Sequence, residues 1–73
     1  MKNKRMRMAR MECELSQAQL AEAVGVTRQT ISLIESGSYN PTLNLCIAIC
    51  RTLGKTLDEL FWQTEQAEKG NES

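Results

Sequence analysis

Hydrophobic and polar positions between residues 16 and 37 recur at the spacing of two short helices joined by a tight turn. The two apolar faces that would pack together consist of Leu20, Ala21, Val24, Val26, Ile31 and Ile34. Gly25 lies between them, where a sharp chain reversal favours a residue that adopts positive φ without a steric penalty. Ser16 followed by Gln19 has the form of a capping box, and Thr27 can cap the second helix. The pattern therefore predicts two packed helices, over 17–24 and from 28 to about 36.

The remaining sequence predicts three more helices. The first spans about 3–13 and is expected to present Met6, Ala9 and Cys13 to the core. Another follows Thr42 and ends before Gly54. Its expected inner stripe is Leu43, Cys46, Ile49, Cys50 and Leu53, which leaves Leu45, Ile47 and Ala48 outside.

A second capping-box pattern, Thr56 with Glu59, predicts a last helix that carries Leu57, Leu60, Phe61 and Trp62. Because no stretch alternates with a period of two residues, we expect an all-α fold of five helices. Residues 1–63 would form one domain, and the polar, aperiodic residues 64–73 would form a disordered tail.

Several short sequence motifs carry a resemblance to a known family. They are Leu15-Ser16-Gln17, Leu20-Ala21, Val24-Gly25-Val26-Thr27, Thr30-Ile31-Ser32 and Glu35-Ser36-Gly37, followed by Asn40-Pro41-Thr42-Leu43, Leu53-Gly54 and Leu57-Asp58-Glu59-Leu60-Phe61. Their order resembles the helix-turn-helix domains of the phage repressor, Cro and Xre family over roughly residues 5–62. The resemblance implies a five-helix, lambda-repressor-like DNA-binding domain in which the second and third helices form the helix-turn-helix.

Two residues depart from the family pattern. Glu14 stands where the family often has a glycine that ends the first helix, and Ala9 stands where it often has leucine. A flexible methionine, Met6, Met8 or Met11, is expected to fill the volume beside Ala9.

The third helix carries the candidate DNA-reading residues. At about 100° per residue, Thr27, Ile31 and Ile34 fall on one side of this helix. The opposite side carries Arg28, Gln29, Ser32 and Leu33. Arginine can bond two guanine acceptors, glutamine can pair with adenine, and an apolar side chain can contact the methyl group of thymine. We therefore predict base contacts from these four residues, which match family positions that touch bases; the alternative is that Arg28 and Gln29 are ordinary surface residues.

Other positions match family contacts with the DNA backbone. Gln17 and Thr27 stand where the family binds phosphate with side chains and helix N-terminal amides. The resemblance also assigns phosphate contacts to the loop of Ser38, Tyr39 and Asn40, although Tyr39 would equally well pack beneath that loop. It further implies an ion pair between Arg10 and Glu35; a phosphate contact by Arg10 is the alternative.

Charge is balanced overall but unevenly distributed. Nine basic and nine acidic residues give a net charge of zero, which is unusual for a nucleic-acid-binding domain. Residues 1–28 nevertheless hold six of the basic residues, namely Lys2, Lys4, Arg5, Arg7, Arg10 and Arg28. This distribution favours a positive DNA-facing side, the alternative being a solvated charge run.

The cysteines Cys13, Cys46 and Cys50 form an odd set in a chain without histidine. The spacing matches no common metal site, so we expect buried small hydrophobic residues and neither a metal nor another cofactor. A redox or metal sensor is the alternative interpretation.

Size bears on how the domain would act. A domain this small reads only a few base pairs, so we expect a homodimer on a two-fold operator. Leu45, Ile47 and Trp62 supply surplus apolar surface for the dimer interface, whereas Phe61 is assigned to the core.

The leading hypothesis is a sequence-specific transcriptional regulator that represses by occupying an operator. The alternative is an antitoxin or phage control protein that acts mainly through a protein partner. An enzyme is disfavoured because no histidine is present to activate a nucleophile. The chain has neither an apolar signal core nor a membrane-length apolar run, so we expect a cytoplasmic protein without a membrane partner.

Overall fold

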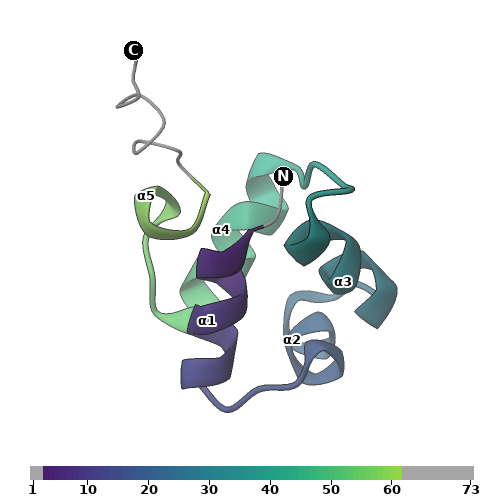
Figure 1. The fold of residues 1–73 in the computed structure, drawn as a ribbon, viewed down its shortest axis with the longest axis horizontal. Helices are drawn as coiled ribbons and strands as arrows, with labels where there is room; N and C mark the ends of the chain where they lie inside the picture. The colour runs from purple at the N-terminus through teal and green to yellow at the C-terminus, as the bar shows by residue number, and fades with distance from the viewer. Residues whose placement is uncertain (1–2, 62–73) are drawn as a thin grey trace.

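The structure is a computed structural model that describes residues 3–61. This part of the chain forms five helices: α1 (Lys4–Glu12), α2 (Gln17–Val24), α3 (Arg28–Ser36), α4 (Leu43–Leu53) and α5 (Leu57–Leu60) (Figure 1). It contains no strand, so the predicted all-α architecture is confirmed for residues 3–61. Trp62 and the expected tail over 64–73 lie outside the described residues.

Each helix begins at a side chain that caps its free backbone amides. The Ser16 hydroxyl accepts a bond of 3.0 Å from the Gln19 amide, and the Gln19 side chain accepts one of 2.8 Å from the Ser16 amide. Thr56 and Glu59 form the same reciprocal pair at the start of α5. Asn3, Thr27 and Thr42 cap the other three helices. These local bonds explain why the helix starts follow so closely from the sequence.

The turns on either side of α2 each contain a residue with a left-handed backbone. Gly25 ends α2 with φ of 80°, a conformation that glycine adopts at little cost. Glu14, just after α1, has φ of 59° and is the single non-glycine residue at positive φ within 3–61. The position at which the family often has glycine therefore does adopt the backbone that favours glycine.

The core lies where α1, α2, α3 and α4 meet. In Figure 1, α1 lies in front of α4, with α2 and α3 on one side and α5 on the other. The core cluster comprises Met6, Ala9, Leu20, Ala21, Ile31, Ile34, Ile49, Cys50, Leu53 and Leu60. Met6 is fully buried whereas Met8 and Met11 are exposed, so Met6 is the methionine that fills the space beside Ala9. Phe61 packs partly buried against this cluster.

Three expected placements were wrong, and all three lie near helix ends. Cys13 is exposed because it caps the C-terminal end of α1, where the chain turns away from the core; its Sγ lies 3.6 Å from the Leu53 carbonyl oxygen. Leu43 is 65% exposed because α4 begins there, and burial on this helix starts only further along. Leu45, expected outside the inner stripe, packs against the core instead.

Candidate nucleic-acid interface

The outer face of α3 is the first part of the candidate interface. Arg28 and Gln29, in its first turn, are exposed, and Leu33 is 38% exposed. Ser32 is half-buried. Ile31 and Ile34, on the opposite face, are buried in the core. We call Arg28, Gln29, Ser32 and Leu33 the base-contact surface, because these are the four residues that the sequence predicts to contact bases.

An ion pair fixes the C-terminal half of α3 to α1. Arg10 Nε donates to Glu35 Oε2 at 2.7 Å, and Arg10 Nη2 donates to Oε1 at 3.4 Å. The third nitrogen, Nη1, donates to the Leu15 carbonyl oxygen at 2.8 Å. Both charged side chains are nearly buried, with 11% of Arg10 and 6% of Glu35 exposed. Such a bidentate, desolvated pair gives Arg10 a structural role in the folded chain.

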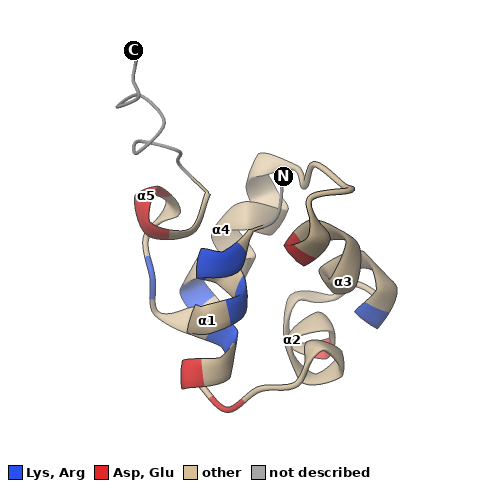
Figure 2. Cartoon of the chain, viewed as in Figure 1, with Lys and Arg blue, Asp and Glu red and all other residues tan. Residues whose placement is uncertain are grey.

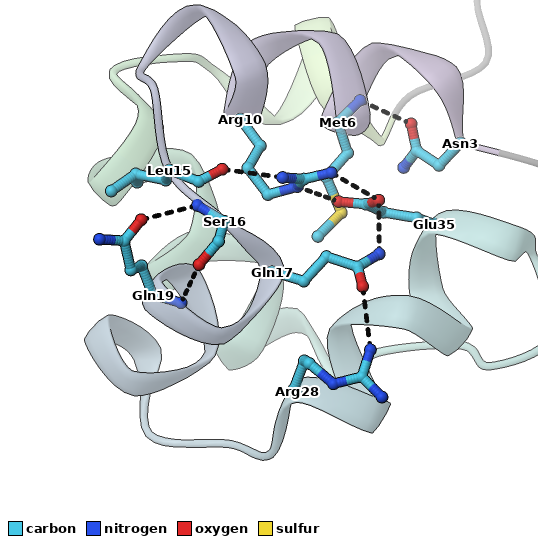
Figure 3. Close-up of polar contacts among 9 residues, drawn as sticks. All are labelled: Asn3, Met6, Arg10, Leu15, Ser16, Gln17, Gln19, Arg28 and Glu35. Atoms are coloured by element: carbon cyan, nitrogen blue, oxygen red, sulfur yellow. Dashed lines mark hydrogen bonds and ion pairs between the residues drawn. The ribbon is translucent and has the colours of Figure 1, made fainter.

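Gln17 connects this ion pair to the base-contact surface. Its Nε2 donates to Glu35 Oε1 at 3.1 Å, and its Oε1 accepts from Arg28 Nη1 at 3.2 Å (Figure 3). Both ends of the Gln17 amide are thus bonded within the protein, although the sequence suggested only a phosphate contact. The connection was missed because it joins three helices, and its only trace in the sequence is an amide-bearing residue that suits both a carboxylate and a guanidinium.

The other expected phosphate contacts lie at the two ends of α3. Thr27 is exposed at the N-cap, where its Oγ1 accepts from the Thr30 amide at 3.2 Å. Ser38, Tyr39 and Asn40 are exposed in the loop that follows α3. The two groups therefore flank the base-contact surface along the helix.

Basic residues of α1 border the same side of the molecule. A groove of about 580 Å³ lies between α1 and α3, and its lining includes Lys4, Arg7, Gln17 and Ser32. Lys4 and Arg7 are exposed. Figure 2 shows blue segments along α1 and at the start of α3, and red on α5. The uneven charge of the sequence thus becomes a basic border beside α3, although the sequence did not single out Lys4 and Arg7.

The expected dimer residues lie on or after α4. Leu45 and Ile47, the two expected dimer residues on α4, are half-buried. Leu43, which the sequence assigned to the inner stripe of this helix, is 65% exposed. Trp62 lies outside the described residues.

The cysteines divide between surface and core. Cys46 and Cys50 are buried in α4, and desolvation by burial raises the pKa of both thiols. Within residues 3–61, no group of three or more Cys, Asp or Glu side chains is arranged to hold a metal ion. In the same range, no helix has the length and apolarity needed to cross a membrane.

Comparison with known families identifies the class of protein. A family model described as helix-turn-helix matches residues 6–60. The chain belongs to this family, which has the Xre and lambda-repressor-like fold expected above. Family membership implies a DNA-binding transcriptional regulator, which is a non-enzymatic class of protein.

Three relatives illustrate this membership. The chain is 42% identical over 66 residues to the uncharacterized HTH-type transcriptional regulator YgzD of Bacillus subtilis (strain 168), covering 90% of this chain and 98% of the relative. It is 46% identical over 61 residues to an uncharacterized HTH-type transcriptional regulator of Methanothermobacter thermautotrophicus, covering 82% and 88%. A similar regulator of Archaeoglobus fulgidus is 40% identical over 57 residues, covering 78% and 81%.

Proposed function

We propose that this protein is a sequence-specific repressor that binds a two-fold operator as a homodimer, with the first turns of α3 in the major groove of each half-site. The observation that supports this proposal best is the exposure of Arg28 and Gln29 on a helix whose other face is buried. An α-helix fits the major groove, and the N-terminal residues of such a helix reach the base edges.

Each residue of the base-contact surface has a distinct role in this proposal. Arg28 donates two bonds to a guanine, and Gln29 pairs with the donor and acceptor of an adenine. Ser32 bonds a base near the middle of the half-site, and Leu33 packs against a thymine methyl group. A good bidentate contact provides about 1–3 kcal/mol of discrimination against the wrong base.

Phosphate contacts hold α3 in its register along the groove. Thr27 contacts the backbone at one end of α3, and the Ser38–Asn40 loop contacts it at the other. Lys4 and Arg7 on α1 face the phosphates beside the groove that they line. Each phosphate neutralised in this way makes the affinity more sensitive to salt, but adds no sequence preference.

Dimerisation supplies the rest of the specificity. Two copies that meet through the exposed Leu43 and the half-buried Ile47 of α4 present two α3 helices to successive turns of the duplex, about 10 base pairs apart. A protein bound in this way blocks promoter access simply by occupying the DNA.

Selection of binding sites from random duplex DNA tests the proposal. We expect enrichment of two half-sites related by two-fold symmetry, with two chains bound per duplex in analytical ultracentrifugation. Fluorescence anisotropy should show at least about 10³-fold tighter binding to the selected site than to a scrambled duplex. Equal affinity for both duplexes, or one chain per selected site, would contradict the proposal.

A further inference from the structure

We propose that Glu35 is a positioning residue for base recognition, because it acts through Gln17 to hold the Arg28 guanidinium in place for its base. Glu35 is nearly buried and makes its contacts within the protein, so its effect on sequence preference would be indirect. The proposal rests on the function proposed above, in which Arg28 reads a base.

The geometry supporting this inference is a hydrogen-bond relay of four residues, Arg10, Glu35, Gln17 and Arg28 (Figure 3). The buried end of the relay is rigid, because two guanidinium nitrogens of Arg10 hold the Glu35 carboxylate. Glu35 in turn holds the Gln17 amide at 3.1 Å, and Gln17 holds Arg28 at 3.2 Å. The buried ion pair therefore restrains Arg28, an exposed side chain in the first turn of α3, through Gln17.

Hydrogen-bond chemistry determines which way the Gln17 amide points. A carboxylate can only accept, and a guanidinium can only donate. Gln17 must therefore turn its NH₂ group to Glu35 and its oxygen to Arg28. The reverse orientation would place two acceptors face to face at Glu35 and two donors face to face at Arg28. The negative charge of Glu35 thus selects the Gln17 orientation that attracts Arg28.

This arrangement leaves Arg28 able to bind DNA. The bond to Gln17 uses one of the five N–H donors of the guanidinium, so enough donors remain for a bidentate contact with guanine. Arginine otherwise loses considerable rotamer freedom when a complex forms. A side chain that is already oriented in the free protein loses less conformational entropy on binding. This gain in affinity applies only to the base that the side chain is oriented to read.

The first test is Glu35→Gln. The new amide oxygen at position 35 can still accept from Arg10, and its NH₂ group then faces Gln17. Gln17 is forced to turn its own NH₂ group toward Arg28, which repels the guanidinium. We expect discrimination at the base pair read by Arg28 to fall about 3- to 10-fold, with unchanged affinity for random DNA.

A second variant, Gln17→Met, leaves the Arg10–Glu35 ion pair intact and keeps the length of the side chain. It removes both bonds of Gln17, so we expect a similar loss of discrimination at the same base pair and none at the base pair read by Gln29. This variant also keeps the proposal testable if Glu35→Gln does not fold, as judged by circular dichroism. Glu59→Gln makes the same chemical change in the capping box of α5 and should leave every base preference unchanged.

The double variant Glu35→Gln, Gln17→Met decides whether Glu35 acts through Gln17. If it does, the double variant loses no more discrimination than Gln17→Met alone. Additive losses, an equal loss at every base pair, or no loss in either single variant would overturn the inference. Arg28→Ala separates this result from failure of the proposed function. If Arg28→Ala changes no base preference, both the base-reading role proposed for Arg28 and the positioning role of Glu35 are wrong. If it abolishes one preference that Glu35→Gln and Gln17→Met leave intact, only the positioning role is wrong.

Discussion

Helices α3 and α4 each bury one face in the same core, but they expose different residues where they begin. The exposed first turn of α3 carries Arg28 and Gln29, whereas the exposed first residue of α4 is Leu43. A polar helix surface suits a wet groove lined with donors and acceptors, and an apolar one suits another protein surface. Under the proposed function, this difference separates the surface that reads DNA from the surface that joins two copies.

The two helices are also held differently. The ion pair between Arg10 and Glu35 fixes α3 to α1 through charged bonds. The inner face of α4 packs apolar side chains and the thiols of Cys46 and Cys50 into the core. Directional bonds fix the orientation of a helix more narrowly than apolar contacts do, which suits the base-reading role that we propose for α3.

The largest expected effect comes from breaking the ion pair that holds α3. Arg10→Met leaves the Glu35 carboxylate desolvated without its main partner, so urea denaturation should show a loss of about 3–5 kcal/mol in the free energy of unfolding. Adding Glu35→Leu to the same chain removes the stranded charge and should restore most of that loss. If Arg10→Met costs less than about 1 kcal/mol, α3 is not held by the pair in the way described.

The thiols test how α4 is held. Cys13 is exposed, whereas Cys46 and Cys50 are buried with raised pKa values, so a thiol reagent should label Cys13 about 100-fold faster. The raised pKa means that the folded chain favours the neutral thiols of Cys46 and Cys50, which contributes to the stability of the fold. This contribution is present in full below the pKa that the thiols have in the unfolded chain, and it is lost as the pH rises through their pKa in the folded chain. Cys13→Ser should abolish the fast phase; three equal rates would show that α4 is not packed as described.

The outer face of α4 is tested by Leu43→Asp. The new charge lies in the first turn of the helix, where it suits the helix dipole, so the fold should keep its stability. Affinity for a duplex with two half-sites should fall about tenfold, because an apolar contact between copies is replaced by two like charges. Affinity for a duplex with one half-site should not change. If both duplexes lose affinity equally, the proposed division between α3, which reads DNA, and α4, which joins two copies, is wrong.

The smallest expected effects come from substitutions in the two turns that flank α2, which leave the outer surfaces of α3 and α4 unchanged. Glu14→Gly relieves a left-handed backbone at φ of 59°, and we expect thermal unfolding to show a gain of about 0.5–1 kcal/mol. Gly25→Ala is the matched opposite change. An added Cβ there meets no atom within 4 Å, so its cost comes from the backbone at φ of 80° alone. A gain in stability from Gly25→Ala would contradict this account of the turns.

The features that were predicted best from the sequence are the helix caps and turns that depend on residues within one helical turn. The Ser16–Gln19 and Thr56–Glu59 capping boxes and the reversal at Gly25 depend on neighbours three or four residues away, and all are present. The sequence also drew attention to position 14, where the structure has positive φ.

The errors in placing side chains arose near the ends of α1 and α4. Periodicity places Cys13 and Leu43 on inner faces, but it does not state how far the core extends along each helix. The relay was missed for a related reason. Glu35 lies 18 residues from Gln17, and Gln17 lies 11 residues from Arg28, so only the packed arrangement of three helices brings them together.

A base-substitution scan of the selected operator determines whether α3 reads base edges. Affinities of the wild type, Arg28→Ala and Gln29→Ala are measured for duplexes changed at one base pair at a time. We expect each variant to lose about 1–3 kcal/mol of discrimination at one base pair, a different one for each, and to keep the others. Loss of affinity that is uniform over all duplexes, specific and random alike, would contradict the claim.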